Sequence, residues 1–271
     1  MAVRMAEHVA TSFGDLRVEP TPVRLRGSVD GAPALDTTEA LLVWEPGRVV
    51  PQYAVPVADV VAELVPGGDG PRHGPGAQPL GPDGRSVLTP DTGFGVHTSD
   101  GEPLTIRLGG VERVGAAFRP ADPALAGYVV VDFAALDWTE EDEPVVSHPR
   151  DPFHRVDARP SSRHVRIALD GQVLADSRRP LLVTETWLPV RWYLPPGDVR
   201  TDLLTPSGTV TACAYKGVAR YDAIGGRDIA WRYPAPLPGM EALAGLVSFF
   251  TEHVDVSIDG VDVTRPVSPW T

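Results

Sequence analysis

One short segment of the chain, Cys213-Ala214-Tyr215-Lys216-Gly217, gathers residues that could do chemistry. A cysteine becomes a nucleophile when a nearby cation or helix N-terminus lowers its thiol pKa. A lysine removed from water can bind an anion or form a Schiff base, and Tyr215 could orient a substrate. In an extended strand Cys213 and Tyr215 would share one face, so Lys216 could pair with Cys213 only through a bulge at Gly217.

Other candidate residues lie nearby in sequence. Glu185 ends a predicted strand and could act as a general acid or base. Trp231 and Tyr233 are two residues apart, so in a strand they share a face and could wall an apolar or cationic ligand. With Tyr193 they would complete a concave pocket for a small molecule. Lys216, Glu185, Tyr215 and Cys213 would be its catalytic residues.

Each of these residues also has a purely structural interpretation. Free cysteines are usually buried and inert, which could describe Cys213. Lys216 could form a structural ion pair with Glu185, because long charged side chains are rarely buried unless paired. Trp231 and Tyr233 could be ordinary core residues. The alternative to a pocket is therefore a non-enzymatic interaction module built from two packed β domains.

The sequence gives no support for a metal or another cofactor. His148 and His154 are six residues apart in a Pro-rich segment, and no third ligand is identifiable. We expect these histidines to bond the backbone or solvent. Cys213 is the single cysteine, which excludes an intrachain disulfide and any zinc site built on cysteine pairs.

The candidate residues belong to the second of two similar stretches of sequence. Val29–Asp36 resembles Leu169–Asp176 at an offset of 140, and Leu41–Val43 resembles Leu181–Val183 at the same offset. The match continues with Glu45 and Glu185 and with Tyr53 and Tyr193, and later with 124–127 and 242–245. A repeat of this length indicates two related domains.

The first copy differs from the second in two ways: it contains an insertion, and it lacks the candidate catalytic and aromatic residues. The offset falls by about 23 near residues 66–87, a Gly/Pro-rich stretch that contains His73 and is typical of a surface loop. Where the second copy has Cys213, Tyr215 and Lys216, the first has His97, Ser99 and Asp100. Trp231 and Tyr233 align with Ala117 and Arg119. A single functional pocket would therefore lie in the second copy.

These comparisons predict four segments along the chain. Residues 1–19 form an N-terminal extension and 20–140 the first, degenerate repeat domain. Residues 141–159 form a linker and 160–265 the second repeat domain.

The pattern of the second copy predicts a mainly β fold. Val165–Leu169 alternates as a half-buried strand, and the Asp-Gly pairs at 170–171 and 259–260 predict hairpin turns. Further strands are predicted at 172–175, 181–184, 191–194, 209–215, 218–221, 229–233 and 254–258. One helix is predicted over Gly239–His253 from the spacing of its apolar residues. Its counterpart over Ala124–Asp137 could instead contain a strand at 129–131, because three valines favour β structure.

The second copy resembles the bacterial family called domain of unknown function 427. The resemblance rests on Thr211–Gly217 together with 175–177, 181–185, 193–195, 230–234, 244–247 and 254–260. Ala214 stands where the family more often has proline. The segment His148–Asp157 and the ending Arg265-Pro266-Val267 resemble the actinobacterial tandem members. The resemblance implies a β-tent fold, like that of methionine-R-sulfoxide reductases, and no established activity. A nucleotidyltransferase label attached to that family finds no supporting motif here.

Composition narrows the function classes further. The 271 residues carry 24 Lys and Arg against 36 Asp and Glu, a formal charge of −12, which argues against nucleic-acid binding. No apolar stretch approaches the roughly 20 residues of a membrane span, and the N-terminus has no apolar core typical of a secretory signal. A single thiol fits a reducing cytoplasm. The sequence leaves the oligomeric state and the ligand open.

Overall fold

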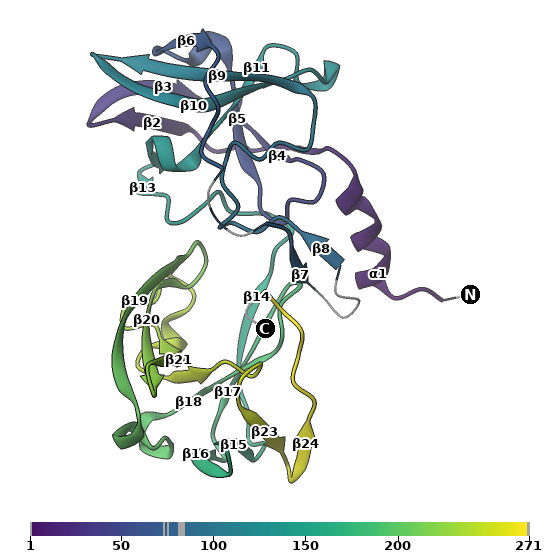
Figure 1. Ribbon diagram of the computed structural model, residues 1–271, viewed down its shortest axis with the longest axis vertical. Coiled ribbons are helices and arrows are strands. Elements are labelled where there is room, and N and C mark those ends of the chain that lie inside the picture. The colour runs from purple at the N-terminus through teal and green to yellow at the C-terminus, as the bar shows by residue number, and fades with distance from the viewer. Residues whose placement is uncertain (1, 73, 75, 81–84, 270–271) are drawn as a thin grey trace. The chain divides into compact units, whose positions relative to one another are not determined.

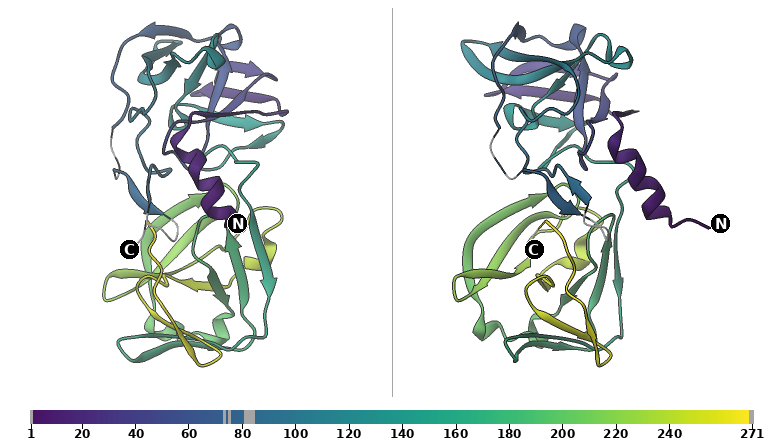
Figure 2. Two further views of the ribbon diagram at one scale, coloured as in Figure 1. Left: turned by 90° about the vertical axis from the view of Figure 1, so that its right-hand side faces the viewer. Right: turned by 45° about the vertical axis from the view of Figure 1, so that its right-hand side comes forward.

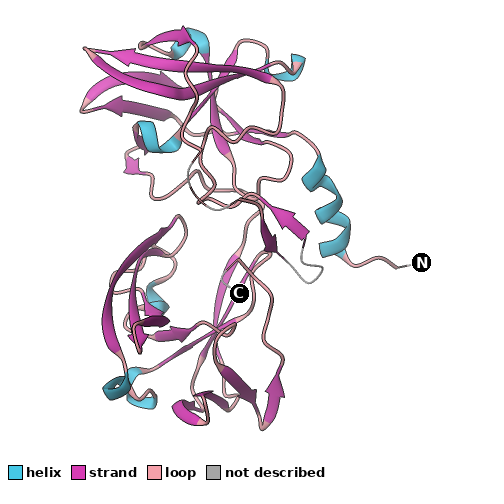
Figure 3. Cartoon of the chain, in the orientation of Figure 1, coloured by secondary structure: helices cyan, strands magenta, loops and turns pink. Residues whose placement is uncertain are grey.

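A computed structural model describes residues 2–72, 74, 76–80 and 85–269. It divides the chain into two compact units, Met1–Gln78 with Ser86–Asp151, and Pro79–Arg85 with Pro152–Thr271. Strands dominate both units, and the helices are short (Figure 3). The predicted fold class, mainly β with two small domains, is therefore confirmed.

The first unit contains a seven-stranded and a four-stranded antiparallel sheet (Figure 1). The larger sheet has the order β1 (Arg17–Pro20), β4 (Leu41–Trp44), β5 (Gln52–Pro56), β11 (Tyr128–Val131), β10 (Val111–Pro120), β9 (Gly101–Leu108), β6 (Glu63–Pro66). The smaller has the order β13 (Glu143–Pro144), β12 (Asp137–Glu140), β2 (Leu25–Val29), β3 (Ala32–Thr37). Its helical segments are α1 (Met5–Ala10), η1 (Thr11–Gly14), η2 (Val57–Asp59), η3 (Pro123–Leu125) and η4 (Phe133–Ala135).

The second unit repeats this topology strand for strand. Its larger sheet has the order β14 (Val156–Pro160), β17 (Leu181–Glu185), β18 (Arg191–Leu194), β22 (Val247–Phe249), β21 (Arg227–Arg232), β20 (Gly217–Ile224), β19 (Thr205–Cys213). The smaller has the order β16 (Gln172–Ser177), β15 (Val165–Leu169), β23 (Asp255–Ile258), β24 (Val261–Val263). Its short 3₁₀ helices are η5 (Pro196–Asp198), η6 (Thr201–Leu203) and η7 (Glu241–Leu243). Figure 2 shows β19 and β20 as a long curved ribbon (green) and β23 and β24 in yellow.

The hairpin turns form where the sequence predicts them. Asp170 and Gly171 have φ of 50° and 79°, and Asp259 and Gly260 have 53° and 81°. A type I′ turn needs positive φ at both central residues, which Asp-Gly accepts at low cost. These turns fix the register of β15–β16 and β23–β24.

The helix predicted over Gly239–His253 is wrong. The segment forms η7 and then β22, which lies in the middle of the large sheet between β18 and β21. Gly245 has φ of 72°, which breaks any helix before Leu246. In the first unit the strand alternative is confirmed, because β11 occupies the corresponding place.

The segments predicted as insertion and linker contain strands. The stretch 66–87 contributes β7 (Gln78–Leu80) and β8 (Arg85–Val87), which pair with each other; His73 lies outside the described residues. Between residues 141 and 159, β13 belongs to a sheet of the first unit and β14 to a sheet of the second.

The two faces of each large sheet pack in different hydrophobic clusters. In the second unit one face packs on the small sheet around an apolar core that includes Val165, Leu194 and Phe249. The opposite face carries a second cluster, which includes Tyr193, Trp231 and most of the candidate residues. The fold thus separates a purely apolar core from a face that mixes aromatic and polar groups.

Candidate functional site

The β19–β20 hairpin places Lys216 inside the second unit. Cys213 pairs with Gly217, and Ala214, Tyr215 and Lys216 form the turn between them. The strand predicted over 209–215 therefore ends at Cys213, and alternation no longer decides where Lys216 points. Gly217 has φ of 102°, and a Cβ there would lie 3.2 Å from the Ala235 carbonyl oxygen, so glycine is required. This turn buries Lys216 to 7% exposure.

The Lys216 ammonium donates a hydrogen bond to Oε2 of Glu185, at the end of β17. The two side chains are 8% and 9% exposed. The ion pair weighed as one interpretation of Lys216 thus exists in the structure.

The ion pair holds both groups charged. Burial alone would raise the pKa of Glu185, but the Lys216 charge and hydrogen bonds from His154 and Lys216 outweigh it and lower the pKa to about 2. Burial opposes the charge of Lys216 as well, yet Glu185 raises the pKa of Lys216 above its ordinary value.

His154 is the third member of this cluster. Its Nε2 lies 3.2 Å from Oε1 of Glu185, and its ring stacks on Tyr215 with centroids 4.6 Å apart. The expectation that His154 bonds only backbone or solvent is wrong, whereas Nδ1 of His148 does lie 2.8 Å from a backbone oxygen, that of Pro149. Sequence spacing could not find His154, because the contact depends on the pairing of β14 with β17.

The aromatic candidates lie on the same face of the sheet. Trp231 Nε1 donates to the Tyr193 hydroxyl at 3.0 Å, and the rings of Tyr193 and Tyr233 are 6.4 Å apart. Burial raises the pKa of Tyr193 to about 12, and burial likewise raises the pKa of Tyr233. Both hydroxyls therefore stay protonated and can donate hydrogen bonds.

Ser248 is a polar residue of this face that sequence reasoning missed. Its Cα is paired with Tyr193 on one side and Trp231 on the other. The residue is fully buried, and its Oγ has no hydrogen-bond partner among the described residues. An unsatisfied buried hydroxyl costs about 1–3 kcal/mol, so such groups call for an explanation.

The seven predicted site residues are brought together to different degrees. Cys213 packs against the cluster of Tyr193, Trp231 and Tyr233. Tyr215 lies at the periphery on His154.

Sheet register corrects two alignments made from sequence. Leu41 pairs with Ala54, whereas Leu181 pairs with Tyr193, so Ala54 holds the place of Tyr193 in the first unit. Tyr53 corresponds instead to Trp192.

The next rungs of the sheet extend this register. Ala54 pairs with Val130 and Val130 with Phe118, just as Tyr193 pairs with Ser248 and Ser248 with Trp231. Trp231 therefore corresponds to Phe118, not Ala117. The first unit has neither the tyrosine nor the serine of this row.

The first unit keeps a buried glutamate at the same strand end but surrounds it differently. Oε2 of Glu45 lies 3.5 Å from Nε of Arg48 and 3.1 Å from Nδ1 of His97, and the Ser99 hydroxyl donates to Oε1 at 2.6 Å. Burial works against ionisation, but His97 and Ser99 lower the pKa of Glu45. Several donors already occupy this carboxylate, as expected of a structural anchor.

Among the residues that the structure describes, no three His, Cys, Asp or Glu side chains are grouped so that they could hold a metal ion. None of the described helices is long and apolar enough to cross a membrane.

Comparison with known proteins gives a family match for the second unit. Residues 157–260 match a family described as a domain of unknown function (DUF427). No curated protein matches the chain. The second unit is thus similar to that family over most of its length, and the match includes Glu185, Lys216 and Ser248.

Proposed function

We propose that the second unit binds a small molecule on the face formed by Tyr193, Trp231, Tyr233 and Ser248, next to Lys216 and Glu185. The supporting observation is the fully buried Ser248 hydroxyl, which has no hydrogen-bond partner among the described residues, on the rung of Tyr193 in a sheet that also carries a buried ion pair. Stability alone gives little reason to bury an ion pair, since apolar residues of the same volume are often as stabilising. Polar groups converging on an aromatic face are typical of a ligand site.

Binding fits this site better than catalysis. An acid or base works best with a pKa near the working pH, and a Schiff-base lysine needs a lowered pKa. Here the pKa of Glu185 is lowered and the pKa of Lys216 is raised, so both move away from neutral pH. If the site is catalytic, they stabilise charge and Tyr215 orients the substrate.

A metabolite thermal-shift screen tests this proposal. A ligand at 100 times its Kd stabilises the native state by about 2.7 kcal/mol. We expect at least one compound to raise the melting temperature of the wild type and to lose this effect in Tyr233→Phe and Ser248→Ala. Tyr128→Phe, in the first unit, is the matched control. Stabilisation that survives both site substitutions, or a screen without any hit, contradicts the proposal.

A non-enzymatic interaction module is the second candidate, favoured by the outer edge of the large sheet. β19 is its edge strand, nearly all of it exposed, and Thr205–Cys213 contains no charge. Exposed uncharged edges are templates for pairing with another chain, and most proteins protect them. Under this function Val210→Lys would weaken self-association or partner binding, measured by sedimentation, and the metabolite screen would be negative.

We further propose a tandem of two such domains of the actinobacterial type, with the β-tent fold, acting without metal in the cytoplasm. The identical strand order of the two units supports the tandem, and the single cysteine supports the compartment.

A further inference from the structure

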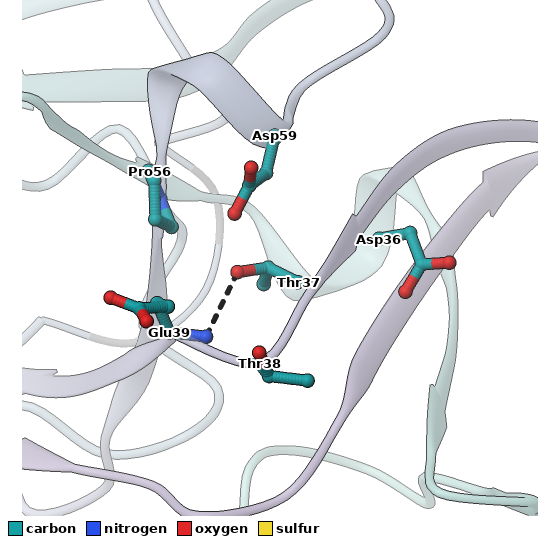
Figure 4. Close-up of a pocket in the computed structure, with 6 residues that line it drawn as sticks. All are labelled: Asp36, Thr37, Thr38, Glu39, Pro56 and Asp59. Atoms are coloured by element: carbon teal, nitrogen blue, oxygen red, sulfur yellow. Dashed lines mark hydrogen bonds between the residues drawn. The ribbon is translucent and has the colours of Figure 1, made fainter.

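The first unit has an open depression of about 470 Å³ where β3 ends and η2 begins (Figure 4). It is lined by Asp36, Thr37, Thr38, Glu39, Pro56 and Asp59. The Asp59 carboxylate points toward Thr37, and the Glu39 amide donates to the Thr37 hydroxyl at 3.0 Å. Asp36, on the rim, is already bonded to Arg24.

Acidic residues alone would not identify a ligand, but the second unit has the same local structure. There the Arg179 amide donates to the Ser177 hydroxyl at 3.2 Å, as Glu39 does to Thr37. The bridges Leu35–Val60 and Ala175–Val199 place Asp59 and Asp198, each one residue earlier, at the same point of the two folds.

In the second unit this place holds a guanidinium. Arg179 donates from Nε and Nη2 to the two oxygens of Asp198, both at 3.0 Å, and the Ser177 hydroxyl donates to the same carboxylate at 2.8 Å. This two-pronged geometry suits a planar guanidinium better than an ammonium or a metal ion.

The first unit keeps the carboxylate and the hydroxyl, as Asp59 and Thr37, but has Glu39 in place of the arginine. At the position of the Arg179 guanidinium the first unit therefore has a second carboxylate.

The distribution of charge along the chain also favours binding of a cation by the first unit. Residues 1–151 contain 23 of the 36 acidic and 11 of the 24 basic residues, so the whole formal charge of −12 lies there. A negative field of this size raises the local concentration of cations and their association rate.

We infer that the first unit binds a guanidinium group from outside the chain, with Asp59 as its two-pronged acceptor and Thr37 and Glu39 beside it. The group can belong to a free small molecule or to an arginine side chain of a protein.

Isothermal titration at low salt with two guanidinium probes tests this inference. The probes are agmatine and the peptide acetyl-Gly-Arg-Gly-amide, and the control is the peptide with uncharged citrulline in place of arginine. We expect one site per chain for a guanidinium probe and at least tenfold weaker binding of the control. Tighter binding of agmatine identifies a free small molecule, and tighter binding of the peptide identifies an arginine side chain. Equal affinity shows that the guanidinium group alone is recognised.

Reciprocal substitutions make the test specific. Glu39→Arg supplies the cation found in the second unit and should abolish binding, and Asp59→Asn should weaken it at least tenfold. Arg179→Glu should open the matching site in the second unit and raise the stoichiometry from one to two. Glu143→Arg makes the same charge change on β13 and should leave binding within about twofold.

Three results would overturn the inference. They are equal binding of the citrulline peptide, undiminished binding to Glu39→Arg, or a loss in Glu143→Arg as large as that in Asp59→Asn. The last would mean attraction by net charge alone. Circular dichroism of each variant shows whether the fold is kept.

Discussion

The chemistry of the second unit depends on where single charges are buried. Lys216 and Glu185 would each be costly to bury alone, and together with His154 they satisfy one another. Three separated segments meet at one carboxylate, so their arrangement cannot be read from the sequence. Residue type alone suggested Lys216 and Glu185 for such a site, but not His154.

Lys216→Met should destabilise the second unit by about 3–5 kcal/mol at pH 7, because it leaves Glu185 buried without its cation. The double substitution Lys216→Met/Glu185→Leu should regain most of this loss. Urea unfolding of the three proteins measures it. A double variant no more stable than Lys216→Met would contradict this account.

The pH dependence of stability follows from the same pair. In the wild type Glu185, with its pKa lowered to about 2, stabilises above about pH 4.5, an effect lost as the pH falls toward 2. Lys216, with its pKa raised, stabilises up to its ordinary pKa of 10.5, and this is lost at higher pH. The pair thus contributes fully between about pH 5 and 10.

Lys216→Met should reverse this dependence. Burial without a cation raises the pKa of Glu185, so folding then takes up a proton and the variant gains stability as the pH falls. The gap to the wild type should narrow between pH 8 and pH 5. A constant gap in urea unfolding over that range would show that Glu185 is not the group left uncompensated.

At the scale of elements, alternation and turn chemistry predicted the strands well, and helical spacing misled at one place. Leu243, Leu246, Val247 and Phe250 fit one helix face, but Val247–Phe249 equally fits a strand with Val247 and Phe249 on one face and Ser248 on the other. Short apolar runs do not distinguish the two. The sheet decides, because β18 and β21 need a strand between them.

Gly245→Ala separates the two structures of this segment. In a helix the change would stabilise, whereas at φ of 72° it should cost about 1–2 kcal/mol. Gly208→Ala, on β19 with no close neighbour and no positive φ, is the control and should change stability little. Chemical denaturation measures the stability of both variants. If Gly245→Ala is more stable than the wild type, the segment is helical after all.

At the scale of the whole molecule, two units share one topology but differ in net charge. The second unit is formally neutral beyond residue 151, and the first carries all of the net charge. Each unit has cores of its own. Self-repulsion should therefore destabilise the first unit alone.

Raising NaCl from 20 mM to 500 mM should therefore stabilise the first unit selectively. Salt shortens the screening length to a few ångströms, which weakens repulsion between like charges. A gain of about 1 kcal/mol corresponds to roughly 2–4 °C for a domain of nearly 150 residues. Calorimetry should show one unfolding transition that moves to higher temperature with salt, which belongs to the first unit. The transition of the second unit is identified as the one that Lys216→Met shifts to lower temperature. Equal shifts of both transitions would contradict this prediction.

The sequence by itself determined the strand content, the hairpin turns and the repeat, because these depend on local alternation, on Asp-Gly pairs and on self-similarity. It also identified Glu185, Lys216, Tyr193, Cys213, Trp231 and Tyr233 as candidates. Only the tertiary structure decided which of them meet. Antiparallel pairing shifts by one residue without changing composition, so register alone showed that Ala54 and Phe118 hold the places of Tyr193 and Trp231. Long-range strand pairing likewise brought His154 to Glu185 and buried Ser248 where no described residue bonds its hydroxyl, because such contacts join residues that no local pattern relates.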